Sequence, residues 1–146
     1  MRVIIQRVLN AHVKIKSDVV GNINQGLLVL VGFSDNDDEN TVIKMCEKLL
    51  NLRIFSDDKG KMNLSLIDIS GEMLIVSNFT LYGNADKGNR PNFSNAGRPD
   101  LAATLYQYMI ENLKRSGLNI QSGEFGAMME VTLTNDGPVT LIIDKE

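Results

Sequence analysis

The sequence has only one cysteine and one histidine among its 146 residues. Because Cys46 has no partner, the chain cannot form an internal disulfide, which fits a reducing cytoplasm. His12 would have to be the base of any Ser-His or Cys-His pair, and there is no Cys/His cluster of the kind that binds zinc. Cys46 lies on the apolar side of a predicted helix, and His12 shares a strand face with lysines. We therefore interpret them as an inert buried thiol and a solvated side chain, and we expect no metal site.

Signatures of cofactor binding and of membrane insertion are also missing. The chain has neither a Gly-x-x-x-x-Gly-Lys-Ser/Thr nor a Gly-x-Gly-x-x-Gly motif, so nucleotide cofactors have no support. The acidic run at residues 35–39 lacks the spacing of a calcium loop and fits a helix N-terminus better. No apolar run approaches the roughly 20 residues that span a bilayer, and the first residues alternate like a strand instead of forming a signal peptide. We expect a cytoplasmic protein without cofactor or membrane segment.

The net charge of −3 does not indicate general nucleic-acid binding, for which a basic surface is expected. Any contact with RNA would have to be local. The candidate basic groups are residues 87–91 with Arg98, and Arg2, Arg7, Lys14 and Lys16 near the start.

Hydrophobic periodicity predicts about eight strands and two helices in a single domain, residues 1–146. The expected strands are residues 2–9, 11–16, a short edge segment near 21–26, 27–33, 52–55, 72–79, 118–122, 127–134 and 139–144. The continuous apolar run at 27–33 predicts a strand that is buried on both faces. One helix follows the acidic loop, with an apolar face of Val42, Met45, Cys46, Leu49 and Leu50. The other begins at Pro99 and has Gly117 at its C′ position. Because helices do not alternate regularly with strands, we predict an α+β fold.

Two segments, residues 77–82 and 135–140, are candidates for a functional site. Residues 77–82 end an apolar strand and open into an irregular loop at 83–98, so Ser77, Asn78 and Thr80 could line a pocket or simply belong to a strand. Thr80 could be a nucleophile, but no residue near it in sequence supplies a base. Residues 135–140 separate two strand-like runs, and their Asp-Gly pair predicts a hairpin turn. Pro138 is unusual there because it removes a backbone donor where the second strand should begin.

These two segments resemble the two motifs of D-aminoacyl-tRNA deacylases. Residues 77–82 read Ser-Asn-Phe-Thr-Leu-Tyr, similar to that family's Ser-Gln-Phe-Thr-Leu-Tyr, and residues 135–140, Asn-Asp-Gly-Pro-Val-Thr, match its second motif. The similarity continues at residues 1–8, 26–32, 51–55, 60–63, 87–91 and 123–127. The resemblance implies a single deacylase domain, with a largely antiparallel or mixed sheet that curls like a barrel and two main helices.

The resemblance also implies a function. It predicts a cytoplasmic homodimer without metal or cofactor that cleaves the ester joining a D-amino acid, or glycine, to the 3′-terminal adenosine of tRNA. The Gly137–Pro138 bond is expected to be cis and to reach the partner's active site, where it excludes L-aminoacyl groups by steric rejection. The resemblance places Ser77, Asn78, Phe79 and Thr80 in the catalytic segment. It makes Gly137, Pro138, Phe125, Ala102 and Met129 substrate-binding residues, with Phe125 packing on the terminal adenine.

Two mechanisms remain open from the residues. Thr80 could attack the ester, or the terminal 2′-hydroxyl of the tRNA could activate water while the N–H groups of Phe79 and Thr80 hold the oxyanion. We favour the second, because no residue can act as a base for Thr80. Arg7 and residues 87–90 are candidates for orienting the partner's Gly-Pro or for approaching phosphate, or they are solvated charges. The chain departs from the family at Asn78, where Gln is usual, and at Asn92, where Ser is usual.

Two other classes of protein compete with this interpretation. A non-catalytic module that binds RNA ends or peptides would explain the absent acid–base pair and the acidic net charge. A general esterase using Thr80 would cleave small activated esters without RNA.

Overall fold

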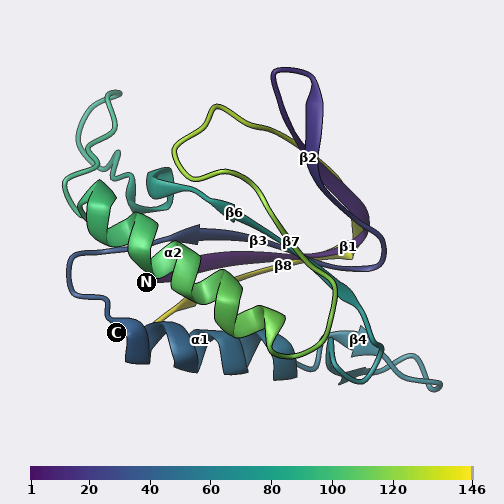
Figure 1. The fold of residues 1–146 in the computed structure, drawn as a ribbon. Coiled ribbons are helices and arrows are strands. Elements are labelled where there is room, and N and C mark those ends of the chain that lie inside the picture. Colours follow the sequence, from purple (N-terminus) through teal and green to yellow (C-terminus); the bar gives the residue numbers. More distant parts are fainter. Residues whose placement is uncertain (146) are drawn as a thin grey trace.

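The computed structural model describes residues 1–145 and has a six-stranded sheet, a two-stranded sheet and two α-helices. The elements in chain order are β1 (Arg2–Ile15), β2 (Asp18–Ile23), β3 (Gly26–Gly32), α1 (Glu39–Asn51), β4 (Phe55–Ser56), β5 (Met62–Leu64), β6 (Glu72–Ser77), the 3₁₀-helix η1 (Phe79–Tyr82), α2 (Pro99–Lys114), β7 (Ile120–Ser122) and β8 (Glu130–Asp144). The predicted α+β class is confirmed. Both helices pack side by side along one side of the sheet (Figure 1).

The long strand β1 organises the sheet. The strand order is β2-β1-β3-β6-β7, and β8 also pairs with β1. β1 is antiparallel to β2, β3 and β8, whereas β3–β6 and β6–β7 are parallel. The first half of β1 lies between β3 and β8, and its second half lies between β2 and β8. This exchange of neighbours along one strand curls the sheet into a nearly closed barrel, which confirms the predicted architecture.

Strand β3 is buried on both faces, as its unbroken apolar run predicted. Leu27, Val29 and Val31 pack into the core beneath α1 and α2. Leu28 belongs to a second cluster on the opposite face, with Val76 and Leu74. Burial on both faces places the carboxyl end of β3 deep in the molecule, next to the carboxyl end of β6.

Helix α1 begins where the acidic loop predicted. Asp38 is its N-cap, and one carboxylate oxygen accepts hydrogen bonds from the N–H and hydroxyl of Thr41, both at 2.8 Å. These bonds favour the ionised form and lower the pKa of Asp38. Val42, Met45, Cys46 and Leu49 are buried, which confirms the predicted apolar face. No helix within residues 1–145 is long and apolar enough to cross a membrane.

Several predicted boundaries were wrong. Residues 2–9 and 11–16 form one strand, because β1 has partners on both sides that carry it through Asn10. The strand expected at 72–79 ends at Ser77, and the strand at 52–55 is only β4. Residues 118–122 contribute only β7, and α2 ends at Lys114, so Gly117 lies beyond the C′ position.

The predicted hairpin at residues 135–140 is also wrong. Both flanking runs belong to β8 and pair with β1, with Thr140 opposite Gln6 and Asn135 opposite Val8. The segment from Asn135 to Thr140 of β8 therefore lies opposite only the segment from Gln6 to Val8 of β1. The extra residues of β8, 136–139, loop out as a bulge. The physical reason is the length of β1, whose 14 residues offer partners to both runs, so the chain need not reverse.

Gly26 lies against the backbone of the neighbouring strand β6. A Cβ atom there would lie 1.8 Å from the carbonyl oxygen of Glu72 on the neighbouring parallel strand. Because β3 is held by strands on both sides, it cannot retreat. We expect Gly26→Ala to lower the free energy of unfolding by about 3 kcal/mol or more, measured by urea denaturation. The adjacent exposed Gln25→Ala is the control and should change it by less than about 0.5 kcal/mol. Equal stability of the two variants would contradict the close approach of β3 and β6.

Candidate active site

A cleft of about 870 Å³ opens where β3 and β6 end, beside the start of α2. Its volume is in the range of small-molecule sites. It is lined by Gln6, Leu28, Leu30, Val31, Gly32, Phe33, Val76, Ser77, Asn78, Phe79, Thr80, Ala96, Gly97, Pro99, Ala102, Phe125, Gly126, Ala127, Met128, Met129, Val131 and Leu133.

The lining of this cleft is mainly apolar and carries no ionisable side chain among the described residues. The hydrophobic residues come from β3, β6 and β8, from η1 and α2, and from the loop at residues 125–129. The polar groups are the side chains of Gln6, Ser77, Asn78 and Thr80 together with exposed main chain. A cleft of this kind can bind an aromatic or apolar group and hold a polar one by hydrogen bonds. Acid–base chemistry would need a group that the ligand brings.

The segment from Ser77 to Thr80 is fixed by the end of the parallel pair β3–β6. Ser77 lies opposite Val31, and the Asn78 N–H donates to the Val31 carbonyl at 2.7 Å. The chain then turns into η1. A Cβ at Gly32 would lie 3.0 Å from the Asn78 carbonyl oxygen, so the neighbouring strand approaches closely here. Ser77, Asn78, Phe79 and Thr80 are therefore held at the rim of the cleft.

Asn78 caps η1 with its side chain. Its Oδ1 accepts from the Thr80 N–H at 3.2 Å and from the Thr80 hydroxyl. A neutral amide oxygen cannot take a proton from this hydroxyl at physiological pH, so the contact orients Thr80 without activating it. The Phe79 N–H makes no hydrogen bond within residues 1–145. The two main-chain donors predicted for an oxyanion therefore differ: that of Phe79 is available, and that of Thr80 is shared with Asn78.

Phe125 forms part of the opposite wall. Its ring packs on Tyr106 with centroids 5.9 Å apart. The Tyr106 hydroxyl donates to the Ile75 carbonyl at 2.9 Å, and burial raises the pKa of Tyr106 to about 12, so it stays protonated. Ala102 of α2 and Met129 line the same cleft. The structure thus brings seven of the predicted site residues together: Ser77, Asn78, Phe79, Thr80, Phe125, Ala102 and Met129.

The other two predicted residues, Gly137 and Pro138, do not line this cleft. They are exposed at the tip of the bulge in β8, and the peptide bond between them is cis. Gly137 has a φ of 141°, and a Cβ there would lie 2.8 Å from a methyl carbon of Val139. Only glycine fits this conformation without displacing the chain.

Two side chains that pattern analysis did not single out as supports brace the bulge. Asn135 Oδ1 accepts from the Val139 N–H at 2.7 Å, and its Nδ2 donates to the Val139 carbonyl at 3.1 Å. Arg7, only 9% exposed, donates to the Asp136 carbonyl at 3.0 Å and to the Ile54 carbonyl at 2.7 Å. Arg7 is therefore not a solvated charge, and it holds its own chain's bulge. The signals in the sequence were the position of Asn135 within the second motif and the candidacy of Arg7 for orienting the partner's Gly-Pro.

The two residues set aside from sequence stay outside the cleft. His12 lies on β1 opposite Thr132 of β8. Cys46 is buried near the Met109 carbonyl, and burial raises its pKa to about 12, so the thiol is not a nucleophile at neutral pH. The loop of Lys87 and Arg90 is exposed and does not line the cleft. Within residues 1–145, no group of three or more His, Cys, Asp or Glu side chains could hold a metal ion.

Comparison with known proteins places this geometry in context. A family model described as D-Tyr-tRNA(Tyr) deacylase matches residues 4–144. The D-aminoacyl-tRNA deacylase of Thermosipho africanus is 51% identical over 146 residues, covering 100% of this chain and 98% of that protein. The D-aminoacyl-tRNA deacylase of Clostridioides difficile is also 51% identical, covering 99% of this chain and 97% of that protein.

Solved structures share the fold. One described as c-Myc DNA Unwinding Element Binding Protein superposes with a TM-score of 0.91 at 38% identity, covering 99% of this chain and 98% of the other. One described as a probable eukaryotic D-amino acid tRNA deacylase has a TM-score of 0.84 at 21% identity, covering 97% of both chains. At that identity the second likeness concerns the fold alone.

Proposed function

The chain belongs to the D-aminoacyl-tRNA deacylase family, whose members hydrolyse an aminoacyl ester bond, and on this premise we propose that it cleaves D-aminoacyl-tRNA, and glycyl-tRNA, by main-chain and substrate groups alone. The observation that carries the proposal is the cleft that has main-chain donors but no ionisable side chain. Its substrate is the 3′ end of aminoacylated tRNA, which it would meet in the cytoplasm.

In the proposed complex, the terminal adenine stacks on Phe125, and Ala102 and Met129 contact the bound adenosine. The position of all three in one apolar cleft supports this assignment. Tyr106 supports Phe125 from behind, so the stacking surface is held by the core. The ester carbonyl then faces Ser77, Asn78, Phe79 and Thr80.

In the proposed reaction, water attacks the ester carbonyl carbon, and the substrate's 2′-hydroxyl accepts the proton that the water loses. The tetrahedral oxyanion accepts hydrogen bonds from the N–H groups of Phe79 and Thr80. The bond between the carbonyl carbon and the 3′-oxygen then breaks, the 3′-oxygen takes up a proton, and free amino acid leaves. Attack by Thr80 is the weaker alternative, because its hydroxyl donates to a neutral amide and no base lines the cleft.

Chirality is read by the bulge in this proposal. In a homodimer, Gly137 and Pro138 of one chain enter the cleft of the other, where an L side chain would collide with their main chain. A D side chain points outward, and glycine has none to exclude, so selection is independent of side-chain identity. Three features support this role: the bulge is exposed, it is braced by Arg7 and Asn135, and it does not contribute to its own cleft.

The test is release of free amino acid from D-tyrosyl-, glycyl- and L-tyrosyl-tRNA under identical conditions. We expect rapid release from the first, measurable release from the second and only the spontaneous rate from the third. No release from any of them would favour a non-catalytic module that binds RNA ends. Turnover of small activated esters without RNA would favour a general esterase.

Asn78 gives a prediction specific to this chain. Because its Oδ1 occupies the Thr80 N–H, it competes with the oxyanion for that donor. Glutamine is a poorer N-cap, so we expect Asn78→Gln to free the donor and raise kcat about fivefold with KM unchanged, equivalent to the roughly 1 kcal/mol of a neutral hydrogen bond. Steady-state kinetics on D-tyrosyl-tRNA measures this, with Lys59→Ala, at an exposed turn outside the cleft, as the control. An unchanged or lower kcat would show that the cap does not compete with the reaction.

A further inference from the structure

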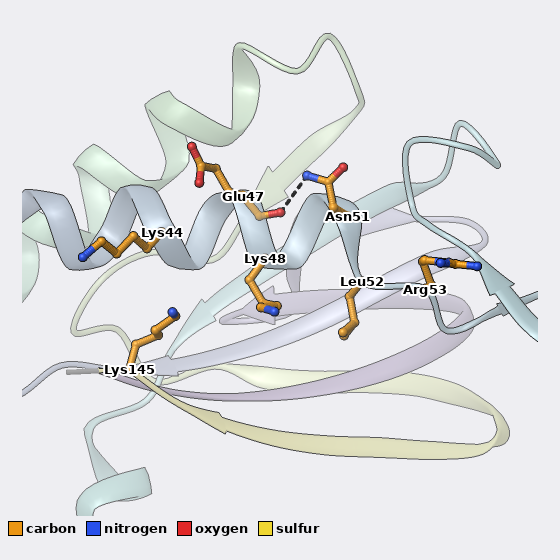
Figure 2. A pocket seen from close by; sticks show the side chains of 7 residues that line it. All are labelled: Lys44, Glu47, Lys48, Asn51, Leu52, Arg53 and Lys145. Carbon is orange, nitrogen blue, oxygen red and sulfur yellow. Dashed lines mark hydrogen bonds between the residues drawn. The ribbon is translucent and has the colours of Figure 1, made fainter.

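A second hollow, of about 400 Å³, lies between the outer side of α1 and the end of the chain's last strand. Its lining residues are Lys44, Glu47, Lys48, Asn51, Leu52, Arg53 and Lys145. Four of the seven are cations, although the whole chain has a net charge of −3. Figure 2 shows Lys48 and Lys145 extending toward the space between α1 and the sheet, while Glu47 points to the opposite side of the helix. The hollow is therefore a local basic surface. The proposed function requires such a surface for contact with RNA, because the chain as a whole is negatively charged.

The four cations of this hollow outnumber its one carboxylate, Glu47, and none of them forms an ion pair within residues 1–145. The arginine ion pairs within the described residues lie elsewhere: they join Arg2 to Asp144, Arg7 to Asp136 and Arg98 to Asp35. None of them includes a cation of the hollow. Arg53 donates to the Asn63 carbonyl at 2.8 Å, which fixes the guanidinium, and its charge contributes to lowering the pKa of Asp68 without forming an ion pair. A neighbouring anion would therefore meet several cations without displacing an internal partner.

The spacing of the lysines costs the helix some stability. Lys44 and Lys48 are four residues apart on an exposed face of α1, and like charges at that spacing repel by a few tenths of a kcal/mol. Lys48 lies in the last turn, where a cation suits the helix dipole. Lys44 lies close enough to the N-cap Asp38 to help lower the pKa of that carboxyl, and Lys145 comes from the other end of the chain. An anionic ligand gives one explanation for all of them.

We propose that this hollow binds a phosphate group of the RNA backbone of the tRNA substrate. The inference rests on the proposed function, because it assumes that the polyanion is tRNA. The hollow is connected to the bulge: Arg53 precedes Ile54, whose carbonyl is held by Arg7, and Arg7 also holds Asp136. In this proposal the bulge of one chain enters the cleft of its partner, and the hollow of the first chain contacts the RNA whose 3′ end lies in that partner cleft. One chain then supplies the catalytic cleft, and the other supplies both the chiral filter and a phosphate contact.

The experiment compares the wild-type protein with Lys44→Ala/Lys48→Ala. Both positions are exposed, alanine is the best helix former, and the change removes a repulsion, so the variant should fold. Binding of uncharged tRNA is measured between 50 and 200 mM salt, a readout that needs no activity. We expect the slope of log affinity against log salt to fall by about 1, the value for one phosphate contact, and affinity at 0.1 M salt to fall about tenfold or more. Lys59→Ala, at an exposed turn outside the hollow, is the control for loss of one charge.

Kinetics on two substrates separates RNA binding from damage to the cleft. The double variant should raise KM for D-tyrosyl-tRNA with little change in kcat, and it should cleave D-tyrosyl-adenosine, which has no phosphate backbone, at the wild-type rate. Unchanged tRNA affinity and salt slope would overturn the phosphate site, as would equal losses on both substrates. If the wild-type protein cleaves neither substrate, the proposed function fails, and the binding measurement still decides whether the hollow holds RNA.

Discussion

D-tyrosyl-tRNA that ends in 2′-deoxyadenosine is expected to be hydrolysed about 100-fold more slowly, or worse, than the natural substrate. The cleft lacks any ionisable side chain, and in the proposed mechanism the proton of the attacking water passes to a group on the substrate. Removing such a group typically costs a factor of 10² to 10⁴. Single-turnover rates measure the chemical step, and matched binding of the two tRNAs shows that the loss is not one of affinity.

Thr80→Ala is the companion variant on the protein side. Because the Thr80 hydroxyl donates to Asn78 and meets no base, its removal should leave most of the single-turnover rate intact. The Thr80 N–H remains in the variant, so the proposed oxyanion contact is kept. An inactive Thr80→Ala together with a fully active deoxy substrate would assign the chemistry to threonine instead of the 2′-hydroxyl.

Gly137→Ala is expected to lower the rate of hydrolysis by a comparable factor and also to lower the selectivity between D- and L-tyrosyl-tRNA. A Cβ at this position would lie 2.8 Å from a Val139 methyl and 2.9 Å from the Val139 nitrogen, so the tip of the bulge must move. A displacement of about 1 Å at a positioning element can cost about 100-fold in rate. We expect kcat/KM for D-tyrosyl-tRNA to fall about 100-fold. We also expect the ratio of kcat/KM for D-tyrosyl-tRNA to kcat/KM for L-tyrosyl-tRNA to be smaller than in the wild-type protein.

The control for this variant is Gly88→Ala. Gly88 also has a positive φ, 74°, but a Cβ there meets nothing within 4 Å, and the residue lies in an exposed loop outside the cleft. It should lose some stability and keep both activity and selectivity. If Gly137→Ala discriminates between D- and L-tyrosyl-tRNA as well as the wild-type protein does, the bulge does not determine the chiral selectivity.

The local signals of the sequence were sufficient for the helices and the buried strand. Asp38 and Pro99 mark helix starts through chemistry that acts within one turn, and the unbroken apolar run of β3 reflects burial on both faces. The segment from Ser77 to Thr80 was found because polar residues at a strand end are visible in sequence and match a family motif. These features depend on neighbours in the chain.

The features that the sequence did not reveal depend on distant partners. The Asp-Gly pair is a local sign of a hairpin, although Pro138 is unusual for one, and the 14-residue length of β1 makes the segment a bulge. The sequence left Arg7 as a candidate for orienting the partner's Gly-Pro, for approaching phosphate or for a solvated charge, whereas its contacts are carbonyls of residues 54 and 136 in its own chain. The cap from Asn78 to Thr80 is local, but it matters only because Thr80 lies at a cleft that three strands and α2 build.

The central claim is that the cleft of one chain works with the bulge of another, and subunit complementation tests it most directly. Thr80→Trp fills the cleft at an exposed position, and Gly137→Ala displaces the bulge, so each variant alone should be inactive on D-tyrosyl-tRNA. Co-expressed with different affinity tags, the two chains should form mixed dimers in which one site has an intact cleft and an intact bulge. Random pairing then predicts recovery of about a quarter of the wild-type activity per chain. No recovery in isolated mixed dimers would contradict a site shared between subunits.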